Sequence, residues 1–381
     1  MEIDQADVVV IGGGVIGLAS AYFIARRGKD VVVLDKGIPG WEASGRNGGW
    51  ASGSPMEEAR VPLVKESIRI WQTLDEELDA PTEFVLGGSL SIALTEEDLL
   101  LQEEMLENRR RWGIESKRLD LKEMEELLPG VSDRALSGIF NPISGQANPQ
   151  LTSQAWVWAI QRNGGRIYEN TTVTGIGVRD DRVTHVETTA GTIRAEKIVN
   201  ATGPWANLIA GMVSQYLPVV AMKIQMLCTL PAPPVATCTW AGNGLYCRQA
   251  ARGHLHFGAG RGQRMSLQNS IEKPTSAAIT RGTAKRFVEL VPGFADVPVL
   301  RTWAGIMDWT PDHMPIIDKF DHPEGMYVNV GFTGIGFSQH PGAGKAMSEL
   351  VVDGECSFDI SGLSLKRFTG IKEFNPLTTA E

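Results

Sequence analysis

The first forty residues switch between two hydrophobic periods. Asp7 to Ile11 is a short run of mainly β-branched residues, which is typical of a strand buried on both faces. Val15 to Arg27 places its apolar residues at helical spacing, Gly28 is a natural helix stop, and Val31 to Leu34 forms a second apolar run. This order predicts a βαβ unit.

Three glycines stand at the first turn of this unit and read G-x-G-x-x-G. Gly12 permits the tight turn, Gly14 lets a pyrophosphate approach the backbone, and Gly17 lets the helix pack closely on the strand. Asp35 closes the second strand, where an acid is expected to bind a ribose hydroxyl. A glycine-rich turn beside a surface aspartate is the alternative. Strand, helix, strand and acid in this order favour a dinucleotide site.

Composition narrows the possible functions. The net charge is −9 and the basic residues form no stripe, so the chain has no electrostatic footprint for nucleic acid or anionic lipid. The acidic start, with Glu2, Asp4 and Asp7, is unlike a signal peptide, and no segment has the length of a membrane span. Four widely spaced cysteines imply neither a zinc knuckle nor a disulfide framework. We expect a cytoplasmic protein with no membrane span.

Three later segments extend the pattern. Residues 44–49 read SGRNGG directly after the second strand, where a nicotinamide dehydrogenase would continue with another βα unit. Residues 197–205 read as a strand that runs into a glycine turn, and Met326 to Val330 reads as a buried strand. The glycine turn GFTGIGF follows that strand at 331–337, and its N–H groups are placed to point at a ring carbonyl.

In this order the segments resemble the D-amino-acid-oxidase-like superfamily of FAD-dependent oxidoreductases. The resemblance is closer to its branch of sarcosine oxidases, β subunits of heteromeric sarcosine oxidase, and opine and proline dehydrogenases. Arg301 to Gly305, Thr310 to Ile317 and Gly331 to Gly344 carry the closer resemblance, which covers essentially the full length.

The resemblance implies an α/β fold with two domains. One is a glutathione-reductase-like, Rossmann-type FAD-binding domain, and the other is a substrate domain whose antiparallel sheet roofs the flavin. The implied division is 1–80, 145–215 and 300–370 for the discontinuous FAD domain, 81–144 and 216–299 for the substrate domain, and 371–381 for a tail.

The resemblance also implies which residues contact FAD and substrate. The expected FAD contacts are Gly12, Gly14, Val15, Ile16, Gly17, Asp35, Lys36, Ser44, Gly45, Arg46, Asn47, Gly48, Gly49, Val173, Ala201, Thr202, Gly203, Trp205, Gly305, Gly331, Thr333, Gly334, Ile335 and Gly336. The residues expected beside the substrate are Trp50, Met307 and Ile335.

One hairpin can be predicted from spacing alone. Residues 245–257 read as two short strands that flank a five-residue loop. If Arg248 pairs with His254, then Tyr246 pairs with His256, and the four side chains share one face of the sheet. The opposite face is apolar and is expected to enter the core. A solvent-facing surface is the commoner fate of such a polar face.

In sarcosine-oxidase relatives the strand position of His256 faces the flavin. By that resemblance His256 is expected to accept the amine proton, because its unperturbed pKa lies near neutrality. Tyr246 is expected to hydrogen-bond the substrate, and Arg248 to hold an acidic group through two hydrogen bonds. These three residues are the catalytic candidates.

Several positions depart from the related enzymes. Glycine and D-amino acid oxidases carry a carboxylate-binding arginine where this chain has Met307. Monomeric sarcosine oxidases carry a cysteine bound to FAD where this chain has Gly305, so we expect non-covalent FAD. They carry a lysine in place of Ser338, and many dehydrogenase relatives carry a histidine in place of Ile335. Residues 146–158 contain no histidine, so covalent FMN is not supported, while free FMN at a subunit interface stays open.

The resemblance implies oxidation of an amine C–N bond, in which a hydride passes to flavin N5 and water hydrolyses the resulting imine. Met307 favours a secondary amine, such as an N-alkyl amino acid, an opine, or a sarcosine- or proline-like compound. The first alternative is a deaminating oxidase of primary amines or amino acids, of the glycine or D-amino acid oxidase type. The second is a non-catalytic flavin subunit of an electron-transfer complex. Oxidase against dehydrogenase, and assembly with other subunits, stay open.

The remaining pattern predicts a coarse map. Residues 166–194 alternate in short β segments and predict a meander. Residues 99–112 predict a charged amphipathic helix whose three arginines at 109–111 form a solvated face. Trp156 and Trp158, at helical spacing, are expected to be packing residues.

Overall fold

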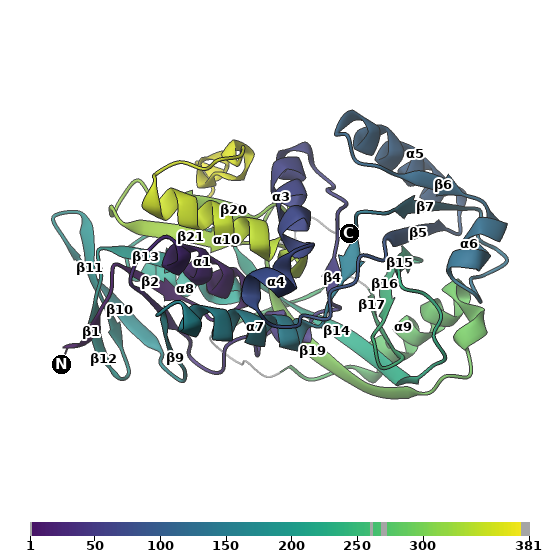
Figure 1. Cartoon of the computed structure of the whole chain (residues 1–381), viewed down its shortest axis with the longest axis horizontal. Coiled ribbons are helices and arrows are strands. Elements are labelled where there is room, and N and C mark those ends of the chain that lie inside the picture. The colour runs from purple at the N-terminus through teal and green to yellow at the C-terminus, as the bar shows by residue number, and fades with distance from the viewer. Residues whose placement is uncertain (1, 260–261, 268–272, 375–381) are drawn as a thin grey trace.

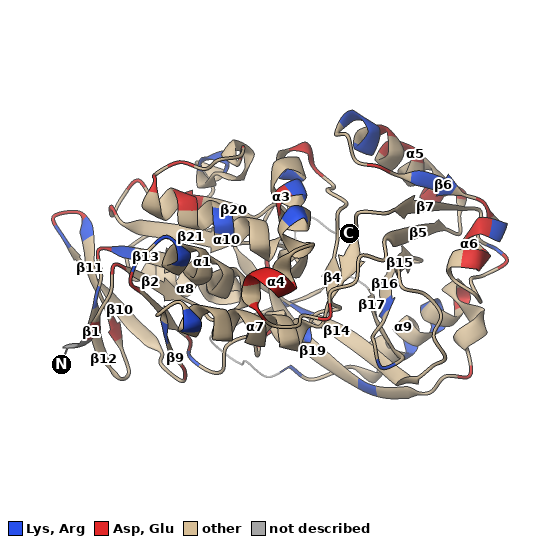
Figure 2. Cartoon of the chain, in the orientation of Figure 1, with Lys and Arg blue, Asp and Glu red and all other residues tan. Residues whose placement is uncertain are grey.

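The structure is a computed structural model that describes residues 2–259, 262–267 and 273–374. Figure 1 shows an elongated molecule with two halves, one built on a mainly parallel sheet and the other on a large, mainly antiparallel sheet. Acidic and basic residues are interspersed over both halves (Figure 2). Within the described part of the chain, no helix is both long enough and apolar enough to cross a bilayer. The predicted tail from residue 375 onward lies outside the described residues.

The six-stranded sheet contains the predicted βαβ unit. Its strand order is β20 (Ile316–Lys319), β21 (Met326–Val330), β13 (Lys197–Asn200), β2 (Val8–Ile11), β3 (Val31–Leu34) and β9 (Arg166–Tyr168), with only β20 antiparallel to its neighbour. Helix α1 (Val15–Arg26) joins β2 to β3, and Gly28 follows it with φ +74°. Alternate residues of β2 enter two different hydrophobic clusters, which explains why the whole run is apolar.

Helices cover one face of this sheet. The main ones are α1, α3 (Val61–Trp71), α7 (Pro149–Arg162) and α10 (Gly336–Val352), and they share one hydrophobic cluster (Figure 1). Gly344 allows α10 to cross α1 closely, because a Cβ added there would lie 2.5 Å from the Cβ of Ala19. The two helices α1 and α10 are therefore packed at close backbone distance on this face of the sheet.

A four-stranded meander packs on the other face of the parallel sheet. Its order is β1 (Glu2–Gln5), β12 (Gly191–Arg194), β11 (Arg182–Thr188) and β10 (Val173–Arg179). The predicted meander is confirmed for β10 to β12, with the turn at Asp180 and Asp181. Residues 166–168 do not belong to it, because helix α7 returns the chain to the open edge of β3, where they pair as a parallel strand.

The second half is built on a nine-stranded sheet. Its order is β18 (Gln263–Met265), β14 (Val220–Pro231), β17 (His254–Ala259), β16 (Leu245–Gln249), β15 (Thr239–Gly242), β5 (Ser89–Ala93), β7 (Ser137–Asn141) and β6 (Lys117–Leu119), and β19 (Val299–Trp309) pairs along β14. One face forms a core with α9 (Ala277–Leu290) and α6 (Leu121–Leu127), and the expected apolar face of the hairpin lies in it. Strand β19 belongs to this sheet, although the predicted division assigns its residues to the FAD domain.

The remaining elements are short, apart from α5. They are α2 (Ala43–Arg46), α4 (Leu74–Leu78), α5 (Glu96–Arg111), α8 (Ala206–Gly211), β4 (Trp50–Ala51), β8 (Gly145–Gln146) and the 3-10 turns Glu58–Arg60, Gly203–Trp205, Pro292–Phe294, Ser361–Leu363 and Leu365–Phe368.

Two packing predictions are wrong in part. Arg109 is only 5% exposed, so the arginine run of α5 is not a uniformly solvated face. Trp156 is fully buried, but Trp158 is 45% exposed. Positions two apart on a helix are separated by about 200° and point in nearly opposite directions, so only one of the two can face the core.

A buried histidine joins three helices of the first half. His340 on α10 packs against the rings of Trp71 and Trp156. Its Nε2 accepts a hydrogen bond from the Trp156 indole at 2.8 Å, and its Nδ1–H donates to the Phe337 carbonyl at 2.7 Å. This arrangement requires the neutral imidazole, and burial lowers the pKa of His340 to about 3.

We predict that His340→Leu lowers the free energy of unfolding at neutral pH by about 1–3 kcal/mol, because it leaves the Trp156 N–H and the Phe337 carbonyl unpaired. The pKa of about 3 in the folded protein lies below that of an unfolded histidine, which is near 6.5. The contribution of native His340 to the free energy of unfolding is therefore complete above about pH 6.5 and is lost as the pH falls from about 6.5 to 3. The difference in free energy of unfolding between wild type and variant should therefore become smaller at acidic pH. Chemical denaturation at several pH values measures it. His322→Gln, at an exposed histidine, is the control, and a gap independent of pH would refute the assignment.

Candidate active site

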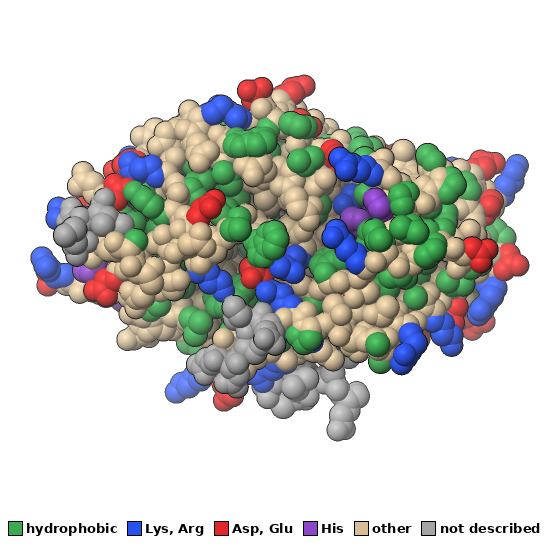
Figure 3. Space-filling model, turned by 90° about the horizontal axis from the view of Figure 1, so that it is seen from below, with side chains coloured by type: hydrophobic (Ala, Val, Ile, Leu, Met, Phe, Trp, Pro, Cys, Tyr) green, Lys and Arg blue, Asp and Glu red, His purple; other side chains and the backbone are tan. Residues whose placement is uncertain are grey.

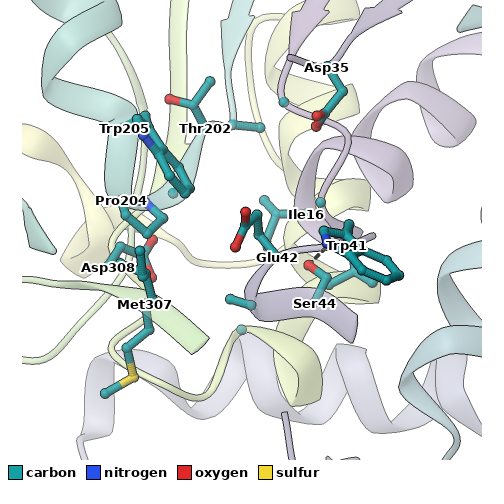
Figure 4. A pocket seen from close by; sticks show the side chains of 18 of the residues that line it. Ile16, Asp35, Trp41, Glu42, Ser44, Thr202, Pro204, Trp205, Met307 and Asp308 are labelled. Atoms are coloured by element: carbon teal, nitrogen blue, oxygen red, sulfur yellow. Dashed lines mark hydrogen bonds between the residues drawn. The ribbon is translucent and has the colours of Figure 1, made fainter. Parts of the chain in front are cut away.

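A cavity of about 310 Å³ lies where the two halves meet. Its floor is formed by the carboxyl ends of β2, β3 and β13 and the first turn of α1, and its roof by β14, β16 and β19. Figure 4 shows side chains from the floor, such as Ile16 and Asp35, and Met307 from β19 of the roof around one shared space. Ligands of open α/β sheets bind at this end of the strands.

The first turn of α1 is held against β13 at backbone distance. Gly12 has φ +109°, and a Cβ added there would lie 2.5 Å from the Ala201 carbonyl oxygen. A Cβ at Gly17 would lie 1.9 Å from the Gly12 oxygen. The N-terminus of α1 therefore opens into the cavity, where its backbone N–H groups are available to an anion. Ser44 Oγ accepts from one of them, the Val15 N–H, at 2.9 Å.

Asp35 lies at the end of β3 and lines the cavity. Its Oδ2 accepts from the Gly13 N–H at 2.7 Å, and its Oδ1 accepts from the Gly37 N–H at 2.8 Å. Each oxygen keeps a lone pair for a hydroxyl donor. Beside it, Lys36 Nζ lies 3.2 Å from the centre of the Trp205 ring, and burial lowers the pKa of this lysine. This corner offers an acid, a cation and an aromatic face.

The comparisons with known proteins agree with this geometry. The family model described as FAD dependent oxidoreductase matches residues 7–350. The chain belongs to this family. It is therefore an FAD-dependent oxidoreductase, and the fold is that of the D-amino-acid-oxidase-like flavoenzymes.

Individual relatives match over nearly the whole chain. Sarcosine oxidase subunit beta of an Arthrobacter species is 32% identical and covers 95% of this chain and 91% of its own length. Glycine oxidase of Geobacillus kaustophilus is 29% identical, with 96% of this chain and 97% of its own covered. The crystal structure of L-proline dehydrogenase from P. horikoshii superimposes with a TM-score of 0.90 at 26% identity, over 98% of this chain and 100% of that one.

Most residues expected to contact FAD line the cavity. They are Gly12, Gly14, Val15, Ile16, Asp35, Lys36, Ser44, Arg46, Asn47, Val173, Ala201, Thr202, Gly203, Trp205, Gly305, Gly334 and Gly336. The open helix N-terminus, the acid at the end of β3 and a roof without a covalent attachment point at Gly305 fit a non-covalently held dinucleotide.

The other expected contacts lie outside the lining. They are Gly17, Gly45, Gly48, Gly49, Gly331, Thr333 and Ile335. At two of these glycines a side chain has no room: a Cβ at Gly45 would lie 2.4 Å from the Gly40 oxygen, and one at Gly331 would lie 2.5 Å from Thr310 Cγ2. Their contact with FAD stays a prediction.

Gly48 and Gly49 meet the substrate sheet. A Cβ at Gly48 would lie 3.3 Å from Tyr246 Cε2, and one at Gly49 would lie 2.8 Å from Arg248 Cζ. These glycines therefore make room for the phenol and the guanidinium of β16. The SGRNGG segment joins the cofactor floor to the face expected to bind substrate.

The predicted register of the hairpin is wrong by two residues. Arg248 pairs with His256 and Tyr246 pairs with Gly258, because β16 continues to Gln249 and the turn is shorter than predicted. A shift of two residues keeps every side chain on its predicted face. Only one of the three catalytic candidates, Tyr246, lines the cavity, while Arg248 and His256 lie one pair further along the strands.

The catalytic candidates have distinct environments. The Tyr246 hydroxyl donates to the Met226 sulfur at 2.8 Å, a weak acceptor that a ligand can replace. Burial, helped by the charges of Arg248, His254 and Arg301, lowers the pKa of His256 to about 3. His256 is therefore a neutral imidazole at physiological pH, and its role as acceptor of the amine proton stays a prediction.

Only one of the three residues expected beside the substrate lines the cavity. Met307 on β19 lines the cavity, whereas Trp50 and Ile335 do not. Trp50 Nε1 donates to the Cys247 carbonyl at 3.2 Å, and its ring meets that of Tyr246 edge-on, 6.3 Å between centres. Trp50 thus supports the position of Tyr246.

Sequence reasoning missed Asp308, which follows Met307 and lines the cavity (Figure 4). It is buried, its pKa is raised by burial, and its Oδ2 accepts from the Gly331 N–H at 2.5 Å. Its carbonyl accepts from the Thr333 N–H at 3.1 Å. Asp308 therefore fixes the last glycine turn against the roof. The available signal was a lone acid within the apolar second half of the strand, residues 303–309.

We predict that Gly12→Ala abolishes most FAD binding, because the new Cβ would collide with the Ala201 carbonyl and displace the helix N-terminus. Gly28→Ala is the matched control, since Gly28 also has positive φ but has nothing within 4 Å of its Cβ position. Flavin absorbance per mole of purified protein should fall about tenfold or more in the first variant and stay near wild type in the second. Equal losses in the two variants would mean that only backbone strain matters.

Proposed function

We propose that this chain oxidises the C–N bond of a secondary amine. The α-carbon of the neutral amine gives a hydride, and water hydrolyses the imine that forms. FAD, when bound, supplies the hydride acceptor N5. The chain's own residues position the α-carbon beneath the roof and keep the amine unprotonated.

The observation that carries this proposal is the charge around the face of β16, β17 and β19. Arg248 and Arg301 both act electrostatically on His256, which stays neutral, and the three share one side of the sheet. A protonated amine placed here meets positive charge, so its pKa falls and the neutral form is favoured. Tyr246 then donates a hydrogen bond to the substrate, and Arg248 binds the substrate carboxylate by donating a pair of hydrogen bonds to it.

Met307 supports a secondary over a primary amine. It projects a thioether where a carboxylate-binding arginine would identify the amino-acid oxidases, and it lines the cavity beside Gly305. Two of the relatives carry names of enzymes for the secondary amines sarcosine and proline. The glycine oxidase relative supports the alternative, a primary amine.

Assembly with other subunits is part of the proposal. Relatives at 32% and 27% identity are named as β subunits of sarcosine oxidase. We therefore expect this chain to function within a heteromeric complex, with non-covalent FAD at the site above and FMN at an interface with another subunit.

We predict that anaerobic mixing of the holoprotein with secondary amines bleaches the flavin absorbance at least about tenfold faster than mixing with matched primary amines, a ratio that a single methyl group in a fitted pocket can supply. The panel pairs N-methylglycine with glycine and proline with D- and L-alanine. Reduction by the primary amino acids alone would overturn the proposal in favour of a deaminating oxidase. No reduction by any amine would favour the non-catalytic flavin subunit.

We predict that the rate of flavin reduction rises with pH as the bound amine loses its proton. The pH–rate profile should show no titration step of His256 between about pH 5.5 and 8. His256 has a pKa of about 3 and does not titrate in this range. Stopped-flow measurements of the reduction rate against pH should give curves of the same shape but different maximal rate for wild type and His256→Gln. A limb near pH 6.5 that only the wild type shows would identify His256 as the proton acceptor after all.

A further inference from the structure

Four adjacent strands place one side chain each in a row across the substrate face. Arg248 pairs with His256, His256 with Cys228, and Cys228 with Arg301, in the order β16, β17, β14 and β19. We call these four residues the cross-strand row. Two residues along from the row, on the same face, lie Tyr246 on β16 and Met226 on β14, and both line the cavity. The row therefore lies about 7 Å from the cavity wall along the strands.

The side chains of the row converge. The His256 ring meets the Trp303 ring edge-on with 5.8 Å between centres, and Arg301 Cζ lies 5.8 Å from the centre of that same Trp303 ring. Both guanidinium groups act electrostatically on His256, and both act on the Cys228 thiol. Figure 3 shows histidine side chains beside basic side chains on one face of the molecule.

Among the described residues, no carboxylate forms a salt bridge with Arg248. It is 5% exposed, and its Nε has no hydrogen-bond partner among the described residues. The acid that acts on it electrostatically is Glu83, which is exposed and accepts from Asn148. Packing against Gly49 fixes the guanidinium at the edge of the cofactor floor. A buried, unpaired guanidinium is costly unless an anion completes it, so this side chain indicates a ligand.

Arg301 provides a second positive charge across the row. Its contact within the described residues is the Trp303 ring, and the side chain is open to solvent. Three inter-strand spacings separate the Cα atoms of Arg248 and Arg301 by about 14 Å, so two long side chains can reach inward to one extended ligand. The neutral His256 and Cys228 between them add no negative charge to balance either arginine.

We propose that the cross-strand row binds a substrate with two carboxylates, one for each guanidinium, and thereby selects secondary amines of the N-(carboxyalkyl) amino acid class. This proposal rests on the proposed amine oxidation and names its substrate class. The amine of such a compound lies between the two acidic groups, so their capture orients the C–N bond along the row. A substrate with one carboxylate would leave the other guanidinium without a counter-ion.

The test is equilibrium binding of non-oxidisable carboxylates to the holoprotein, read from the flavin spectrum and from calorimetry. Glutarate has the carboxylate spacing of iminodiacetate with a methylene in place of the amine, and butyrate lacks the second carboxylate. Wild type should bind glutarate at least about tenfold more tightly than butyrate, the ratio expected for one charge-assisted pair. Arg301→Gln should bring this ratio close to one, while Arg248→Gln should weaken both ligands.

Arg252→Gln is the matched control, because Arg252 is an exposed arginine in the turn of the same hairpin and lies outside the row. It should preserve the wild-type ratio. Equal affinities for glutarate and butyrate in wild type would overturn the proposal, as would an Arg252→Gln effect equal to that of Arg301→Gln. Tight binding of inorganic phosphate in place of glutarate would also overturn it, since the row would then be a general anion site.

Anaerobic reduction separates this proposal from the function on which it rests. Faster reduction by iminodiacetate than by N-methylglycine supports both. Reduction by N-methylglycine with no preference for glutarate over butyrate refutes the two-carboxylate class and leaves amine oxidation standing. Tight glutarate binding without reduction by any amine refutes amine oxidation and leaves the dicarboxylate site standing.

Discussion

The backbone contact between the first turn of α1 and the end of β13 is the constraint on which the site depends. No side chain fits at Gly12 or Gly17, so the helix begins directly against the Ala201 carbonyl. A helix fixed in this way aims its unpaired N–H groups into the cavity whatever its other residues are. Asp35 and Ser44 bind N–H groups of the same turn and set the width of the cofactor floor around it.

The roof is coupled to this floor by hydrogen bonds between β19 and the SGRNGG segment. The Trp303 indole donates to the Arg46 carbonyl at 2.8 Å, and Arg46 donates to the Ala304 carbonyl at 3.3 Å. Asp308, further along β19, holds the Gly331 turn. One strand therefore connects the cofactor cavity, the last glycine turn and the substrate face. A ligand that moves Arg301 or Trp303 acts on a strand that also lines the cavity.

The sequence is most informative where burial on both faces leaves no choice of residue. Strands β2 and β3 follow their apolar runs closely, because all four positions of each strand enter one of the two cores. The hairpin register could not be found in this way, since an alternating pattern is unchanged by a shift of two residues. The glycines at 48 and 49 illustrate a related limit: a glycine indicates close approach but not the partner, and here Tyr246 and Arg248 approach them. Strand β14 was missed because the alternation of its polar residues Lys223, Gln225 and Thr229 is interrupted by an apolar residue.

The charge distribution limits which proton can move in the proposed reaction. The cofactor end presents a helix N-terminus, and the substrate end presents Arg248 and Arg301, so both ends favour anions. His256 is held neutral by burial and by these same cations, and burial raises the pKa of Tyr246 well above its usual value. Neither side chain is a good proton acceptor near neutral pH. The amine itself is then the group with the most accessible proton, and the cations of the row lower the free-energy cost of releasing it before the hydride leaves.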